Sequence, residues 1–231
     1  MTTYALVHGA WHDASCWYLL APELQKLGHE VIAMDLPCDD PSATFSDYAD
    51  VVVRALSGGG DDIVLVGHSL AGHSLPLIAA RRPVRGLVYL CALVAVPGRS
   101  FLEQLHEEPT MLIAGYEAGL EIDHLGRRVW VDADLATKTF YDDCTPRVAA
   151  RAVRSLRAQS ATPYKESCAL ESLPATPATY VVCNRDRLVN PEWSRRVARE
   201  HLGAEIVELQ GGHSPFLSRP TELAEVLHAV R

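Results

Sequence analysis

The stretch that decides the fold is IVLVGHSLAG, residues 63–72. An apolar run leads directly into a G-x-S-x-A motif, and a helix-like stretch follows at Leu75–Arg82. A strand, a sharp turn and a helix in this order are typical of a nucleophile elbow, where a strained serine needs small residues two positions away on either side. Gly67 and Ala71 occupy those positions, Ala71 where the pattern usually has glycine. We therefore predict that Ser69 is a nucleophile.

Short apolar runs like the one before Ser69 recur along the chain. They are Tyr4–Val7, Val31–Met34, Ile63–Val66, Leu87–Cys91, Tyr180–Cys183 and Ile206–Leu209. Their β-branched, nearly unalternating composition suits strands that are buried on both faces. Helix-length segments separate them, at about Ser15–Leu27, Phe45–Leu56, Leu70–Arg81, Pro191–Leu202 and Pro220–Val230. The alternation predicts an α/β fold with a mostly parallel sheet of about six strands flanked by helices.

Residues 97–177 interrupt this rhythm. The segment holds many prolines, charges and aromatic residues and no convincing strand, although Pro146–Gln159 has a helical pattern. A bare loop of this length is improbable in a compact domain. We interpret residues 97–177 as a small helical cap inserted into a core made of residues 1–96 and 178–231.

Composition and charge exclude several classes of protein. The chain has 231 residues, of which 48% are hydrophobic, and 29 acidic against 21 basic residues give a net charge of −8. An acidic chain without a basic face disfavours nucleic-acid and anionic-membrane partners. No signal-peptide pattern and no apolar run of roughly 20 residues is evident, which predicts a cytoplasmic protein. The six cysteines include no close pair or CxxC, so we expect reduced thiols and no metal site.

A base and an acid for Ser69 follow later in the chain. The run Ile206–Leu209 leads into QGGHSPF, which places His213 on a glycine-rich loop after a strand. The run Tyr180–Cys183 leads into NRDRLVN, which places Asp186 just past the end of another strand. Active sites of open parallel sheets form at these carboxyl ends. The order Ser, Asp, His is the one that this type of elbow requires, so we predict a catalytic triad.

Each member of this triad also has a plainer interpretation. Ser69 could be only the N-cap of a helix. His213 could be a solvated loop residue, and Asp186 could be a turn aspartate paired with Arg185 or Arg187. Three such residues, each following a strand and in the required order, favour the triad. Acyl transfer also needs two N–H donors for the oxyanion, and we expect these from Leu70 and Ala10.

Four segments together show a family resemblance. LVHGAW (6–11), VGHSLAG (66–72), VVCNRDRLVNP (181–191) and LQGGHSPFL (209–217) resemble the α/β-hydrolase superfamily. The similarity covers nearly the whole chain and is greatest to the branch of plant methyl-salicylate and methyl-jasmonate esterases and hydroxynitrile lyases. The lyases carry Thr, Cys and Lys where this chain has Gly9, Leu70 and Ser214. The resemblance therefore implies an α/β-hydrolase fold and an esterase without a cofactor.

The predicted activity is hydrolysis of a small carboxylic ester through an acyl-enzyme on Ser69. A lactonase, a C–C hydrolase, a cofactor-free lyase and a non-catalytic small-molecule receptor remain as alternatives, because one site of this type hosts many chemistries. A homodimer is left open. A neutral ester is favoured, since only Arg185 and Arg187 lie near the motifs as partners for an anion. The expected pocket residues are Gly9, Trp11, Phe101, Trp130, Phe140, Tyr141, Leu188, Ser214 and Phe216.

Overall fold

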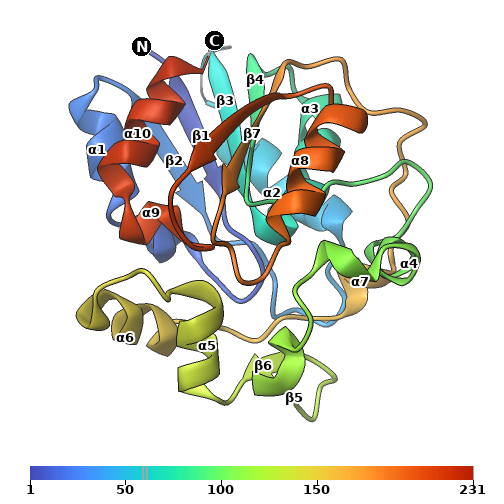
Figure 1. Ribbon diagram of the computed structural model, residues 1–231. Helices are drawn as coiled ribbons and strands as arrows, with labels where there is room; N and C mark the ends of the chain where they lie inside the picture. The colour runs from blue at the N-terminus through green and yellow to red at the C-terminus, as the bar shows by residue number, and fades with distance from the viewer. Residues whose placement is uncertain (59, 61, 231) are drawn as a thin grey trace.

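Six parallel strands form the centre of the molecule (Figure 1). The computed structural model describes residues 1–58, 60 and 62–230. The strands are β1 (Thr3–Val7), β2 (Glu30–Met34), β3 (Ile63–His68), β4 (Gly86–Leu90), β7 (Ala178–Cys183) and β8 (Glu205–Leu209). They lie in the order β2-β1-β3-β4-β7-β8. The prediction of a mostly parallel sheet of about six strands is confirmed, and all five pairings are parallel within this sheet.

The burial of the strands follows their place in the sheet. Every residue of β1, β3 and β4 is buried, whereas four of the five residues of each edge strand, β2 and β8, are exposed or partly buried. Continuous apolar runs such as Ile63–Val66 suit the centre because helices cover both faces there. The predicted nucleophile and the predicted oxyanion loop therefore follow two fully buried central strands, β3 and β1.

Helices cover both faces of the sheet. They include α1 (Leu20–Lys26), α2 (Phe45–Ala55), α3 (Leu75–Arg81), α8 (Pro191–Glu200), α9 (Pro215–Ser218) and α10 (Pro220–Ala229). Helices α1 and α10 lie on one side of the sheet, and α2, α3 and α8 lie on the other (Figure 1). None of the helices in the described parts of the chain is both long enough and apolar enough to cross a membrane.

Two predicted helices are each divided in two. The segment predicted as Ser15–Leu27 contains the 3-10 helix η1 (Ala14–Trp17) and then α1, and the segment Leu70–Arg81 contains η2 (Ser69–His73) and then α3. A proline explains both divisions. Pro22 and Pro76 stand in the first turns of α1 and α3, where a missing N–H costs nothing but a preceding α-helical turn would clash with the ring.

The elements between β4 and β7 gather beyond the carboxyl ends of the strands (Figure 1). They are α4 (Phe101–Glu107), η3 (Pro109–Met111), η4 (Tyr116–Gly119), β5 (Leu120–Ile122), β6 (Arg128–Trp130), α5 (Ala133–Phe140), α6 (Pro146–Arg154) and α7 (Thr162–Lys165). The antiparallel hairpin β5–β6 differs from our expectation of a strand-free helical segment. Its strands have only three residues each, too short to produce a clear alternation in the sequence.

Candidate active site

Ser69 stands at a strained turn between β3 and η2. Its φ angle is +53°, in the left-handed region that residues other than glycine rarely adopt, and its residue surface is 5% exposed. A Cβ on Gly67 would lie 2.7 Å from Leu75 Cγ, and a Cβ on Gly72 would lie 1.9 Å from the Leu93 carbonyl oxygen. The elbow therefore requires glycine most strictly at position 72, three residues after the serine, and Ala71 fits without difficulty.

Two further residues share this unusual backbone conformation. Trp11 has a φ of +63° and Cys91 a φ of +47°, and with Ser69 they are the described non-glycine residues with positive φ. Trp11 follows β1, Ser69 follows β3 and Cys91 follows β4, which are neighbouring strands. Backbone strain of this kind clusters at functional sites, where the surrounding structure holds it in place. The carboxyl edge of the central strands is thus the chemically interesting region of the fold.

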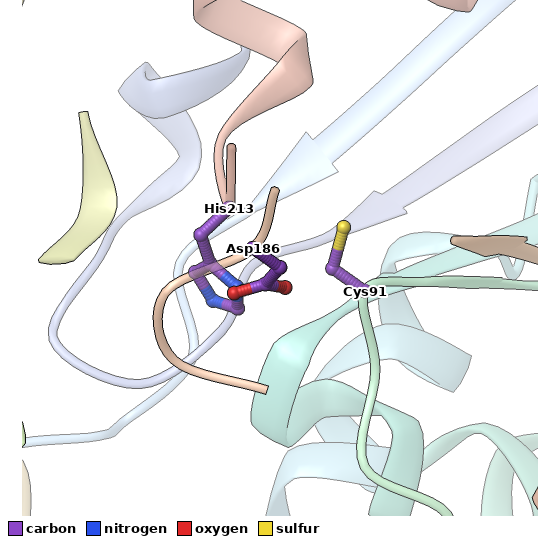
Figure 2. Close-up of side chains that lie close together, drawn as sticks. All are labelled: Cys91, Asp186 and His213. Carbon is purple, nitrogen blue, oxygen red and sulfur yellow. The ribbon is translucent and has the colours of Figure 1, made fainter. Parts of the chain in front are cut away.

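Asp186 and His213 form a buried acid–base pair close to this edge (Figure 2). His213 Nδ1–H donates to Asp186 Oδ2 at 2.8 Å. The other carboxylate oxygen, Oδ1, accepts the backbone N–H groups of Leu188 at 2.7 Å and Val189 at 3.0 Å. With the proton on Nδ1 directed at the carboxylate, the lone pair of His213 is on Nε2, which is buried and has no partner among the described residues. This is the tautomer that a general base needs.

His68 connects the elbow to the loop of His213. Its Nε2–H donates to the backbone carbonyl of His213 at 2.9 Å, and the two imidazole rings lie 4.6 Å apart. Burial holds the pKa of His68 well below its usual value, with a smaller contribution from the neighbouring His213. His68 therefore stays neutral, and because it precedes Ser69 in the chain, it fixes the His213 loop relative to Ser69.

Cys91 lies beside the acid–base pair (Figure 2). Three atoms that could bind a metal, one each from Cys91, Asp186 and His213, lie within 4.8 Å of one another. This spacing is close enough for a metal ion to be considered. A metal would need a thiolate, but burial raises the pKa of the Cys91 thiol well above its usual value. His213 Nδ1 and Asp186 Oδ2 also already bond to each other. The donor set fits an acid–base pair with an apolar neighbour better than a metal centre.

The loop after β1 carries the predicted oxyanion donor Ala10. A Cβ on Gly9 would lie 2.9 Å from Ser69 Cβ, so this loop lies directly against Ser69. His8 Nδ1–H donates to the Gly9 carbonyl at 2.8 Å, while its Nε2 accepts the N–H of Leu36 at 2.9 Å. Because the Gly9 carbonyl and the Ala10 N–H belong to one peptide plane, His8 fixes the direction of that N–H.

Two neutral histidines stiffen this loop. His12 Nδ1–H donates to the Ala10 carbonyl at 2.7 Å, and the Tyr141 hydroxyl donates to His12 Nε2 at 2.9 Å. Burial lowers the pKa of His8 and of His12 to about 4. Both imidazoles are therefore uncharged near neutral pH and act as hydrogen-bonding braces.

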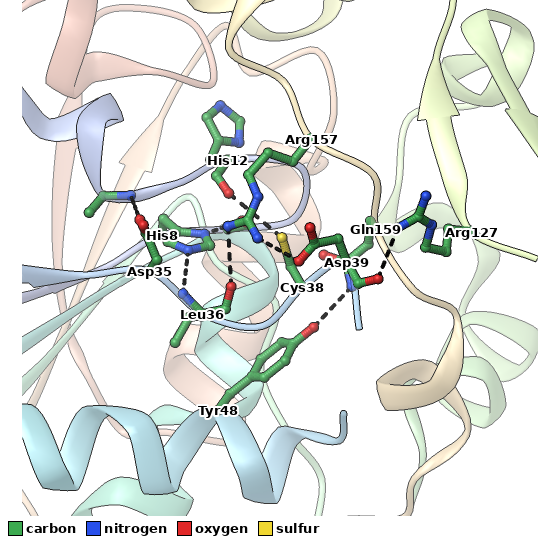
Figure 3. A network of polar contacts seen from close by, with 12 residues as sticks. His8, His12, Asp35, Leu36, Cys38, Asp39, Tyr48, Arg127, Arg157 and Gln159 are labelled. Carbon is green, nitrogen blue, oxygen red and sulfur yellow. Dashed lines mark hydrogen bonds and ion pairs between the residues drawn. The ribbon is translucent and has the colours of Figure 1, made fainter. Parts of the chain in front are cut away.

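The segment between β4 and β7 is fixed to the same loop by a polar network (Figure 3). Arg157 donates from its backbone N–H to the Trp11 carbonyl at 2.7 Å and from its guanidinium to the Leu36 carbonyl at 3.3 Å and to the Asp39 carboxylate. Arg127 Nη1 donates to the Asp39 carbonyl at 3.1 Å. These bonds join loops that follow β1 and β2 to the segment that overlies the elbow.

A pocket opens at Ser69, and the empty space within it and at its open mouth is about 370 Å³. Its walls are made by Ala10, Trp11, Ser69, Leu70, Leu93, Phe101, Leu112, Tyr116, Arg128, Tyr164 and Leu188. Both predicted oxyanion residues therefore border the same cavity as the predicted nucleophile.

The structure distributes the nine expected pocket residues unevenly. Trp11, Phe101 and Leu188 line the cavity. Trp130 and Phe140 instead pack against Trp11, with ring centroids 5.9 and 5.8 Å from it. These two residues support the wall from behind.

The remaining four expected residues lie around the site without forming this cavity. Gly9 packs against Ser69 and Tyr141 bonds to His12. Phe216 packs against His68, with ring centroids 4.8 Å apart, and Ser214 is completely buried next to His213. Leu93, Leu112, Tyr116, Arg128 and Tyr164 line the cavity and were not predicted. They come from separate parts of the chain and share no local motif, so only the tertiary structure brings them together.

Comparisons with known proteins agree with this architecture. The chain is 28% identical over 232 residues to the alpha/beta hydrolase nvfD of Aspergillus novofumigatus, covering 93% of this chain and 90% of that protein. It is 25% identical over 253 residues to methyl jasmonate esterase 1 of Vitis vinifera, covering 98% and 95%. The expected resemblance to the plant methylesterase branch is thus confirmed.

Solved structures show the same fold. The crystal structure of a pyrethroid hydrolase from Sphingobium faniae superimposes with a TM-score of 0.83 at 24% identity, covering 98% of this chain and 96% of that one. Polyneuridine aldehyde esterase superimposes with a TM-score of 0.85 at 22% identity, covering 99% and 98%. The family model of the alpha/beta hydrolases matches residues 5–226. With this match and the elbow geometry, the chain belongs to the alpha/beta hydrolase family.

Proposed function

We propose that the protein is a serine esterase that cleaves a small carboxylic ester. The observation that carries the proposal is the Asp186–His213 hydrogen bond of 2.8 Å, which leaves Nε2 without a partner on a loop that His68, the residue before the strained Ser69, holds by a hydrogen bond. A serine hydroxyl is a weak nucleophile unless a base accepts its proton, and the base must be oriented by a third group. Asp186 is that third group.

The proposed reaction has two steps. Ser69 Oγ attacks the ester carbonyl while His213 Nε2 takes the hydroxyl proton, and the imidazolium then protonates the departing alcohol. Water next attacks the acyl-enzyme, with His213 again accepting a proton, and the acid leaves as Ser69 recovers its hydrogen. The N–H groups of Ala10 and Leu70, which border the cavity, stabilise the oxyanion in both steps.

The names of the relatives favour ester cleavage over the alternatives. A methyl jasmonate esterase and several methylesterases align along almost the whole chain, and a pyrethroid hydrolase does so as well. Gly9, Leu70 and Ser214 stand where the similar lyases carry other residues. We also propose a reducing compartment such as the cytoplasm, because all six cysteines are unpaired thiols.

Replacement of Ser69 by alanine tests the proposal. Ser69→Ala removes the nucleophile from a folded elbow, so we expect turnover of 4-nitrophenyl acetate and of small methyl esters to fall by about three orders of magnitude or more. Wild type should also be labelled at Ser69 by a fluorophosphonate. Ser57→Ala, at an exposed serine after α2, is the matched control and should retain activity. Turnover of these esters by Ser69→Ala at the wild-type rate would refute the assignment.

A further inference from the structure

Arg128 brings a positive charge to the wall of the reactive cavity. It lies on the hairpin strand β6 and lines the same cavity as Ser69, Ala10 and Leu70. The Arg128 guanidinium carbon is 5.1 Å from the ring centroid of Tyr164, which also lines the cavity. The charged end of this side chain is therefore among the residues that enclose the substrate space.

The backbone of Arg128 is fixed on both sides. Its N–H donates to the Gln159 carbonyl at 2.8 Å, and its carbonyl accepts the Trp11 indole N–H at 3.1 Å. Trp11 belongs to the loop that carries the oxyanion donor Ala10. The position of Arg128 is thus tied directly to the reactive centre, as a specificity residue must be.

No ion pair of Arg128 occurs among the described residues, in contrast to two other arginines between β4 and β7. Arg127 pairs with Asp123 at 2.7 Å, and Arg157 pairs with Asp39. The nearby Glu117 carboxylate instead accepts a hydrogen bond from the Tyr116 hydroxyl at 3.2 Å. Arg128 is partly buried, and the neutral Tyr164 ring beneath its guanidinium is a weaker partner for the charge than a carboxylate.

The surroundings of the guanidinium favour a planar anion. Tyr116 and Tyr164 both border it from the cavity wall, and burial raises the pKa of both phenols, so neither provides a negative charge near neutral pH. A carboxylate matches the fork of an arginine through two parallel hydrogen bonds. Resting on the proposed esterase function, we propose that Arg128 binds a carboxylate of the substrate, so that the preferred substrates are esters carrying a second, free carboxyl group.

An acidic ester differs from the neutral ester that we expected from the sequence. That expectation depended on Arg185 and Arg187 being the cations nearest the motifs. Arg187 is paired with Asp142 at 2.7 Å, and neither residue lines the cavity. The sequence did not indicate Arg128, because it does not show which part of residues 97–177 faces Ser69.

Matched ester pairs test the inference. 4-Nitrophenyl hydrogen glutarate and 4-nitrophenyl pentanoate have acyl chains of equal length, with and without a carboxylate. 4-Acetoxybenzoate and 4-methylphenyl acetate place the same difference on the alcohol side. We expect wild type to favour the acidic member of one pair, and Arg128→Gln to reduce the acidic-to-neutral ratio of kcat/KM for that pair about 10- to 100-fold. Arg128→Lys, which keeps the charge but not the fork, should reduce the ratio less.

Controls separate this inference from the esterase proposal. Arg154→Gln makes the same charge change at an exposed position of α6 and should leave the ratio unchanged. If wild type cleaves these esters and Arg128→Gln alters neither ratio, the inference is overturned while the esterase proposal stands. If no ester is cleaved, calorimetric binding of glutarate that is lost in Arg128→Gln would support the inference alone. An equal affinity for glutarate in the two proteins would overturn it.

Discussion

Asp186→Asn offers a sharp test of the proposed acid–base pair, because the structure predicts which way the new amide would turn. Asp186 Oδ1 accepts two backbone N–H groups, from Leu188 and Val189, while Oδ2 accepts His213 Nδ1–H. An asparagine oxygen can replace only one of these two carboxylate oxygens. Directing the amide NH₂ at the two backbone donors would sacrifice two hydrogen bonds, at a cost of about 3 kcal/mol, or roughly 100-fold.

The amide NH₂ of the variant must therefore point at His213 Nδ1. That nitrogen then becomes the acceptor, and the histidine proton moves to Nε2, where it prevents the imidazole from taking the proton of Ser69. Restoring the reactive tautomer costs about 100-fold, and the lost charge of Asp186 no longer stabilises the imidazolium. Together these effects predict a fall in kcat of about 10³- to 10⁴-fold, the size found when the same change is made in a serine-protease triad.

The assay combines kinetics with a direct view of the tautomer. Turnover of 4-nitrophenyl acetate gives kcat, and ¹⁵N NMR of the histidine ring reports which nitrogen carries the proton. Asp50→Asn is the matched control, since Asp50 makes an exposed ion pair with Arg81 on α2 and α3. Activity of Asp186→Asn within tenfold of wild type, or a proton still on His213 Nδ1, would refute the reasoning.

Two further predictions concern stability. Gly72→Ala would place a Cβ 1.9 Å from the Leu93 carbonyl oxygen and should lower the unfolding free energy by at least about 1–3 kcal/mol, whereas Gly86→Ala, with its nearest neighbour at 3.6 Å, should change it less in urea titrations. His8 and His12 have folded pKa values lowered to about 4, so the unfolded chain binds more protons below about pH 6.5. Stability should be complete above that pH and decrease as the pH falls towards 4, by about 2 kcal/mol per histidine at pH 5. A urea midpoint equal at pH 7 and pH 5 would contradict this assignment.

The strands and the proposed triad could be predicted because their signals are local. Ser69, Asp186 and His213 each follow directly on an apolar run, and parallel strands bring their carboxyl ends to one edge of the sheet. The division of the two predicted helices before α1 and α3 could also have been predicted, from the positions of their prolines. Pro22 and Pro76 stop a helix from extending backward through them, and this could have been read from the sequence.

The cavity could be predicted only in part, because its walls are formed by residues that are far apart in the chain and meet only in the folded structure. Trp130 and Arg128 are two residues apart on β6, so the pleat directs both side chains to the same face of the hairpin. The sequence singled out Trp130 for its size, but its ring packs behind Trp11 while Arg128 reaches the cavity. Aromatic character alone did not distinguish a supporting residue from a lining one.

An acidic protein can prefer an acidic substrate when a positive side chain borders the cavity. Here the net charge of the chain is −8, whereas Arg128 at the cavity wall is positive. The −8 of the chain is distributed over many exposed side chains, and ionic strength screens each of them beyond a Debye length of about 8 Å. Several arginines are also neutralised by carboxylates, as Arg127 is by Asp123 and Arg195 by Glu208. The partly buried Arg128 guanidinium borders the cavity and has no ion pair among the described residues, so we expect its short-range attraction for a carboxylate to outweigh the repulsion of the distant surface charges. Composition describes the outside of such a molecule, and the charge that selects a substrate is the one that borders the cavity.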